Sequence, residues 1–107
     1  MVSSISNQNN PNSVSVKQYF KFEKMLCVDL VFDKTTNTIQ SIKITGDFFL
    51  HPEEKIDLIE SEIVGEKLEK DGIKKKLESL LLSCEFYGFS IDSLSDAIIR
   101  CKEADPH

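Results

Sequence analysis

The chain has 107 residues, a net charge of −5 and a sequence pI near 5.0. A chain of this length forms one domain with a modest core, so we expect no second catalytic module. The acidic balance argues against a nucleic-acid-binding face, and apolar runs such as 48–50 and 80–82 are far shorter than the roughly 20 residues that cross a bilayer. We therefore expect neither a nucleic-acid partner nor a membrane partner.

The first sixteen residues are rich in serine and asparagine. They lack the basic region and apolar core of a secretory signal, and their composition predicts a disordered tail over residues 1–16, ahead of a domain over residues 17–104. The cysteines, which lie far apart and form no C-x-x-C pair, are Cys27, Cys84 and Cys101. This spacing predicts reduced thiols and a cytoplasmic protein.

The N-terminal half of the domain has the pattern of a small sheet. Residues 17–22 favour a short strand, and in the strand that follows every other side chain is apolar, namely Leu26, Val28, Leu30 and Phe32. Residues 33–37 are typical of a turn, and residues 39–49 then return as the partner strand. The two longer runs therefore predict an antiparallel hairpin.

The C-terminal half has the pattern of three helices. Pro52 fits the first helical position, where its missing N–H costs no hydrogen bond, and Glu53 and Glu54 place negative charge at the positive end of the helix dipole. Apolar residues within 73–84 predict a second helix, and Ser90 predicts the cap of a third. The fold class is therefore α+β, with a small antiparallel sheet of two to three strands followed by three helices packed on one face.

Few residues suggest chemistry performed by this chain. Its four glycines are isolated rather than gathered in a phosphate-binding loop. His51 lies near Asp47, but no nucleophile stands at a recognisable spacing, so we interpret His51 as a residue that precedes or caps the first helix. The lysines at 74–76 are most simply a solvated helix face, with a docking patch for an acidic partner as the alternative. We expect no catalytic residue, no metal site and no cofactor bound by this chain.

One stretch of the chain resembles a known family. It joins the last predicted strand to the first helix and reads Thr45-Gly46-Asp47-Phe48-Phe49-Leu50-His51-Pro52-Glu53-Glu54, with Ile63-Val64-Gly65 at the end of that helix. It is similar to the small accessory domain of lipoate–protein ligases, and the resemblance runs from about residue 24 to residue 101. In that family the domain is fused after the catalytic domain or encoded as a separate subunit.

The resemblance implies a non-catalytic accessory subunit of a two-chain, ATP-dependent lipoate–protein ligase. Its partner would be the catalytic subunit, as a heterodimer. The complex would use ATP, Mg and lipoate to form lipoyl-adenylate, and would then modify a lysine of acceptor lipoyl domains. In the family the accessory domain is implicated in the activation step.

We expect contact with the catalytic subunit where the strand meets the helix. Gly46 suggests a bulge or a close backbone approach, and Phe48 and Phe49 point to opposite faces if the strand persists. One ring then enters the core while the other is offered to the partner; burial of both rings in this domain's own core is the alternative. The candidate interface residues are Gly46, Asp47, Phe49, Leu50 and His51.

Two other functions use features of the same sequence. Asp33-Lys34 at the predicted turn is similar to the modified lysine of a lipoyl carrier domain, but carriers are all-β and this chain has helices after Pro52. Iron–sulfur scaffold proteins also combine a small sheet with helices and three cysteines, but their first cysteines lie on converging loops, and those of this chain fall in a strand and on apolar helix faces. A protein-interaction module for another enzyme is the broader alternative.

Overall fold

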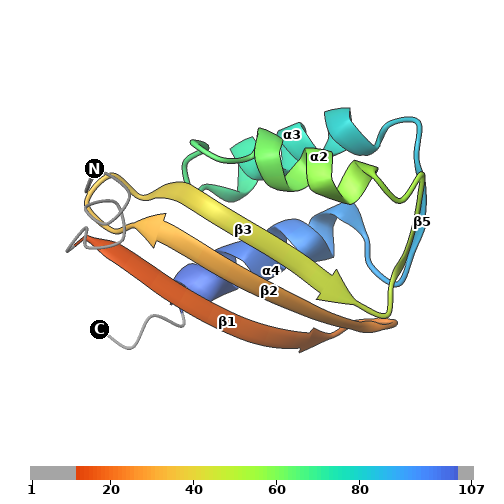
Figure 1. Cartoon of the computed structure of the whole chain (residues 1–107), viewed down its shortest axis with the longest axis horizontal. Coiled ribbons are helices and arrows are strands. Elements are labelled where there is room, and N and C mark those ends of the chain that lie inside the picture. Colours follow the sequence, from red (N-terminus) through yellow and green to blue (C-terminus); the bar gives the residue numbers. More distant parts are fainter. Residues whose placement is uncertain (1–11, 104–107) are drawn as a thin grey trace, which may run out of the picture.

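The computed structural model of the chain describes residues 12–103. This part of the chain contains a three-stranded antiparallel sheet in the order β1-β2-β3, a separate pair of strands, β4-β5, and three helices, two of which lie between β4 and β5 in the sequence (Figure 1). The predicted α+β class is confirmed. The bounds are β1 (Ser13–Lys21), β2 (Met25–Asp33), β3 (Thr38–Gly46), β4 (Phe49–His51), α2 (Lys55–Glu62), α3 (Lys70–Leu81), β5 (Glu85–Tyr87) and α4 (Ile91–Glu103).

One face of the three-stranded sheet forms the core with the helices. Along β2 the alternate side chains predicted to be buried do face inward, and Val28 and Leu30 are fully buried. The register places them beside Ile44 and Ile42 of β3, so the inward rows of the two strands lie on the same face. Helix α4 lies across β1 and β2, while α2 packs against β3 (Figure 1). The helices therefore cover a single apolar face.

Strand β1 begins at Ser13, four residues before the predicted domain boundary at residue 17. Val14 and Val16 continue the inward alternation and pair with Phe32 and Leu30 of β2. The prediction of a disordered tail is therefore wrong for residues 13–16, because the valines between the serines supply a strand pattern. Residues 1–11 and the predicted domain end at residue 104 lie outside the described part of the chain.

The outer edge of β3 is covered by α2 and the loop after it. A carboxylate oxygen of Glu60 accepts a hydrogen bond from the Ile44 N–H at 2.8 Å. Further along the strand, the Gly65 N–H donates to the Ile39 carbonyl at 2.8 Å, and the Ile39 N–H donates to the Glu66 carbonyl at 3.0 Å. Backbone groups that an edge strand leaves unpaired are thus satisfied by this segment.

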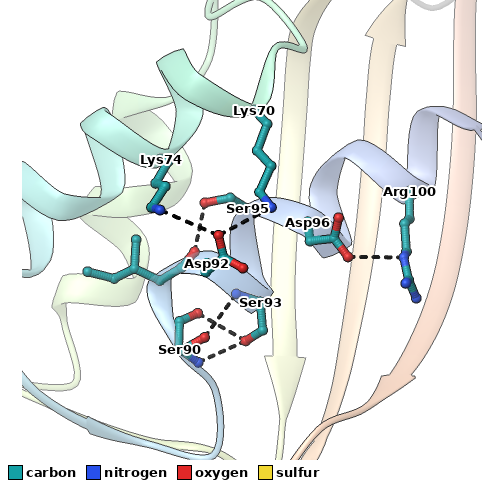
Figure 2. Close-up of polar contacts among 9 residues, drawn as sticks. Lys70, Lys74, Ser90, Asp92, Ser93, Ser95, Asp96 and Arg100 are labelled. Carbon is teal, nitrogen blue, oxygen red and sulfur yellow. Dashed lines mark hydrogen bonds and ion pairs between the residues drawn. The ribbon is translucent and has the colours of Figure 1, made fainter.

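Helix α4 begins with a reciprocal pair of serine hydrogen bonds (Figure 2). The Ser93 N–H donates to the Ser90 hydroxyl at 3.0 Å, and the Ser90 N–H donates to the Ser93 hydroxyl at 2.8 Å. This arrangement satisfies N–H groups that the first helical turn leaves free. The predicted cap at Ser90 is confirmed.

The start of α4 is also tied to α3 by charge. The Asp92 carboxylate lies 3.2 Å from the Lys70 ammonium and 3.4 Å from that of Lys74 (Figure 2). The hydrogen bond and charge of Lys70, helped by Lys74, hold the pKa of Asp92 below its usual value. Lys76 pairs in turn with Glu62 and Glu66 at 4.0 and 3.7 Å. Two lysines of the 74–76 run therefore form ion pairs within this domain.

The passage from β3 to α2 differs from the sequence prediction. The strand expected to continue to Phe49 ends at Gly46, and residues 49–51 form β4, which pairs with the unpredicted strand β5. Helix α2 begins at Lys55 with Glu54 as its cap residue, so Pro52 is not the first helical residue. The extended pairing of β4 with β5 delays the helix, and a turn over residues 52–54 intervenes.

Gly46 provides a test of the close approach at the end of β3. Its φ of +148° disfavours a side chain, and a Cβ there would overlap the carbonyl oxygen of Met25. We expect Gly46→Ala to lower the free energy of unfolding by roughly 2 kcal/mol or more. Gly72 in α3 has open space around it, and Gly72→Ala should raise that free energy by about 0.5–1 kcal/mol. Equal denaturation midpoints for the two variants would contradict this account.

The buried thiol of Cys101 makes the free energy of unfolding depend on pH in the alkaline range. Burial raises the pKa of its thiol from 9.0 to about 12, with smaller contributions from Cys27 and Asp29. The unfolded chain therefore releases this proton near pH 9 while the folded chain holds it, so the free energy of unfolding falls as pH rises from about 9 to 12. Over this range, denaturant titrations should give a shallower decline for Cys101→Ala than for the unaltered chain. Parallel declines would show that the thiol contributes nothing.

Candidate functional site

In the strand pair β4-β5, one side of both strands faces the core and the other side faces solvent. Leu50 and Phe86 face each other across the pair and point inward, and Leu50 is only 5% exposed. The neighbours on either side alternate outward, so Phe49 is 52% exposed and its cross-strand partner Tyr87 is 55% exposed. Two large rings therefore lie together on the surface.

We define the aromatic face as the outward side chains of this pair: Phe49, His51, Glu85 and Tyr87. The rings of Phe49 and His51 lie nearly parallel, with centroids 6.5 Å apart and planes 9° apart. His51 sits opposite Glu85 in the strand register. Exposed large rings gathered in this way are typical of a surface that binds another protein.

A cluster of phenylalanines supports the aromatic face from inside. Phe48 meets Phe89 edge to face at 5.4 Å, and Phe86 stacks on Phe89 at 5.1 Å. Gly88, with φ +106°, follows β5, and a Cβ there would lie 3.0 Å from the side chain of Lys24 and 3.1 Å from Phe48 Cα. This close packing fixes β4 and β5 against the turn that joins β1 to β2.

An open groove of about 250 Å³ runs beside the inner side of β4. It is mostly apolar, with one carboxylate at its rim. The side chains and backbone that line it belong to the end of β3, to β4 and to the start of α2: Ile44, Thr45, Gly46, Phe48, Leu50, Glu53 and Ile56. The predicted meeting point of strand and helix is therefore both exposed and indented.

The five predicted interface residues have different positions. Phe49 and His51 belong to the aromatic face, and Asp47 is exposed beside it. Leu50 lies in the core cluster and its small exposed part lines the groove, while Gly46 is held where β3 approaches Met25. The alternative that both phenylalanines pack in the core is wrong for Phe49.

Tyr87 and Glu85 are not among the residues that the sequence predicts at the interface, because no strand is predicted between the second and third helices. The available signal is Glu85-Phe86-Tyr87, in which a charged residue and a tyrosine flank an apolar residue, whereas Phe49-Leu50-His51 begins with two apolar residues. Three residues are too few for a period of two to stand out without knowledge of the pairing partner. Each of the two short strands can be recognised only from its pairing with the other.

In the described part of the chain, the three cysteines and His51 are not grouped in the way that a metal site requires. Cys27 lies in β2 and Cys101 in α4, both buried, while Cys84 is half-buried after α3. The raised pKa of Cys101 disfavours the thiolate that a metal ligand needs. Within residues 12–103 no group of three or more histidine, cysteine or carboxylate side chains is placed to hold a metal ion.

The structure also shows where Lys34 and the apolar segments of the chain lie. Lys34 is exposed in the turn between β2 and β3, where Asp33 accepts hydrogen bonds from the Thr35 and Thr36 N–H groups. The helices that follow exclude the all-β fold of a lipoyl carrier. Among the described helices none is long and apolar enough to cross a membrane.

Comparison with known proteins links this fold to one enzyme system. A family described as "Bacterial lipoate protein ligase C-terminus" matches residues 12–98. A similar solved chain comes from an archaeal lipoylation system of Thermoplasma acidophilum, a bi-partite lipoate protein ligase and its E2 lipoyl domain. The two chains are 25% identical with a TM-score of 0.65, over 80% of this chain and 93% of that one. The curated proteins contain no match.

The opposite positions of Phe49 and Leu50 give different expectations for their truncation. Leu50→Ala should lower the free energy of unfolding by about 2–4 kcal/mol, because it leaves a cavity in the core. Phe49→Ala removes an exposed ring and should cost less than about 1 kcal/mol. Urea denaturation of the two variants measures both values. A larger loss for Phe49→Ala would place its ring in the core instead.

Proposed function

This chain belongs to the family of bacterial lipoate protein ligase C-terminal domains, and we propose on that basis that it is the non-catalytic accessory subunit of a two-chain, ATP-dependent lipoate protein ligase. The family match carries the proposal because it takes in the sheet, the pair β4-β5 and most of the helices. The similarity to a chain from a bi-partite ligase supports a separate accessory polypeptide.

The complex would carry out two steps in this proposal. In the first, the lipoate carboxylate attacks the α-phosphorus of ATP, giving lipoyl-adenylate and pyrophosphate. In the second, a lysine amine of an acceptor lipoyl domain attacks the acyl carbon, so that an amide forms and AMP leaves. ATP, Mg and lipoate would be bound by the catalytic subunit, where the metal ion offsets charge on the phosphates.

The contribution of this chain would be to order its partner. Docking would favour the conformation of the catalytic subunit in which a loop closes over the adenylate and excludes water. Asp47, Phe49 and His51 are the proposed contacts from the strand-to-helix segment, since all three are exposed. We place the heterodimer in the cytoplasm, where its thiols stay reduced.

The proposal is tested by measuring lipoyl-adenylate formation with the catalytic ligase polypeptide of the same organism. We expect adenylate formation to rise at least ~10-fold when this chain is added at equal concentration, because the closed conformation becomes more populated. Pyrophosphate release gives an independent readout of the same step. The Leu50→Ala variant has a destabilised core, so it shows how much activation depends on an intact fold.

A second assay separates activation from transfer. Chemically prepared lipoyl-adenylate is supplied to the catalytic polypeptide together with an acceptor lipoyl domain. Acyl transfer that proceeds without this chain, beside activation that requires it, would assign the accessory role to the first step. Full activation by the catalytic polypeptide alone would reject the proposed function.

A further inference from the structure

The two segments that build the aromatic face are acidic in sequence, and Lys24 approaches them from the turn between β1 and β2, beside Gly88. These segments, residues 47–54 and 85–87, contain four carboxylates and neither lysine nor arginine. All four side chains belong to exposed residues: Asp47, Glu53, Glu54 and Glu85. The face therefore combines exposed rings with the Glu85 carboxylate, and the segments that build it contain three further exposed carboxylates.

These carboxylates form no ion pair within the described part of the chain. The ion pairs there involve lysines of α3, with Asp92, Glu62 and Glu66 as their partners, and the Asp96–Arg100 pair of α4. Across β4 and β5, Glu85 stands opposite His51, next to the ring pair of Phe49 and Tyr87. A negative charge thus lies two residues along β5 from Tyr87, on the same outward side of the strand pair.

An arginine side chain has the chemistry to satisfy both features. Its planar guanidinium stacks on an aromatic ring, whose face carries partial negative charge, and its N–H groups bind a carboxylate in a two-pronged geometry. Arginine and aromatic side chains are both enriched at protein interfaces. Lysine supplies the charge but lacks the flat surface.

We propose that the aromatic face docks an arginine-bearing segment of the catalytic ligase subunit, with the guanidinium on the rings of Phe49 and Tyr87 and its N–H groups on Glu85. This inference rests on the proposed function, which supplies the partner. It adds the surface and the chemistry of the segment that fits there. Charge complementarity with Glu85 and the other exposed carboxylates of these two segments selects this occupant.

The experiment measures the dissociation constant between the full-length chain and the catalytic ligase polypeptide at low and high salt. Glu85→Arg reverses the charge beside the rings and should weaken binding at least ~10-fold near 50 mM salt, with a smaller effect near 500 mM, because screening reduces charge contacts. The matched control is Glu78→Arg on the exposed side of α3, which makes the same charge change away from the face. It should leave binding within about two-fold of the unaltered chain.

A second pair of variants tests the rings. Tyr87→Ala should weaken binding at least ~10-fold, as expected for a buried aromatic contact at an interface. Tyr19→Ala on β1 removes a ring of similar exposure, 63% against 55%, and should leave binding unchanged. Thermal denaturation measures whether each of the four variants is folded, and the two charge variants decide the question if Tyr87→Ala unfolds.

The outcomes separate this inference from the proposed function. Selective loss of binding by Glu85→Arg and Tyr87→Ala supports it, and restoration of Glu85→Arg by an arginine-to-glutamate change in the partner identifies the matching segment. Equal effects of Glu85→Arg and Glu78→Arg would overturn it while leaving the heterodimer in place. If the unaltered chain neither binds nor activates the catalytic polypeptide, the proposed function fails first and this inference fails with it.

Discussion

Burial of one face of the three-stranded sheet is the constraint from which the rest of the structure follows. Strand β2 contributes the central row of that face, and its fully buried members are matched in register by isoleucines of β3. Because α4 covers β1 and β2, and α2 packs on β3, the chain between β3 and α2 must cross the end of the sheet (Figure 1). The pair β4-β5 forms at this crossing.

The same burial decides which side chains face solvent at the crossing. Leu50 and Phe86 complete the core, so the period of two in a strand leaves Phe49, His51 and Tyr87 outside. Exposure of these rings is therefore a consequence of core packing. The phenylalanine cluster below holds them in a fixed arrangement.

How far the sequence predicts this structure depends on the length of each pattern. The nine-residue strand β2 and the helices α3 and α4 repeat their apolar spacing often enough to be recognised, and Ser90 identifies the start of α4. The short strands β4 and β5 are stabilised by long-range pairing, which no local pattern contains. Phe49 and His51 could be predicted as exposed residues from their position between strand and helix. The burial of Leu50 and the place of Tyr87 on the aromatic face could be recognised only once the pairing of β4 with β5 was known.

The two edges of the three-stranded sheet differ in how they meet a foreign strand. The β3 edge is covered, because Glu60 and the loop at Gly65 already form hydrogen bonds with its backbone groups. Strand β1 pairs only with β2 among the described strands, but its sequence carries Lys17 and Lys21 and no carboxylate. Two copies that met along β1 would bring like charges together, so one edge resists sheet growth by coverage and the other by electrostatic repulsion.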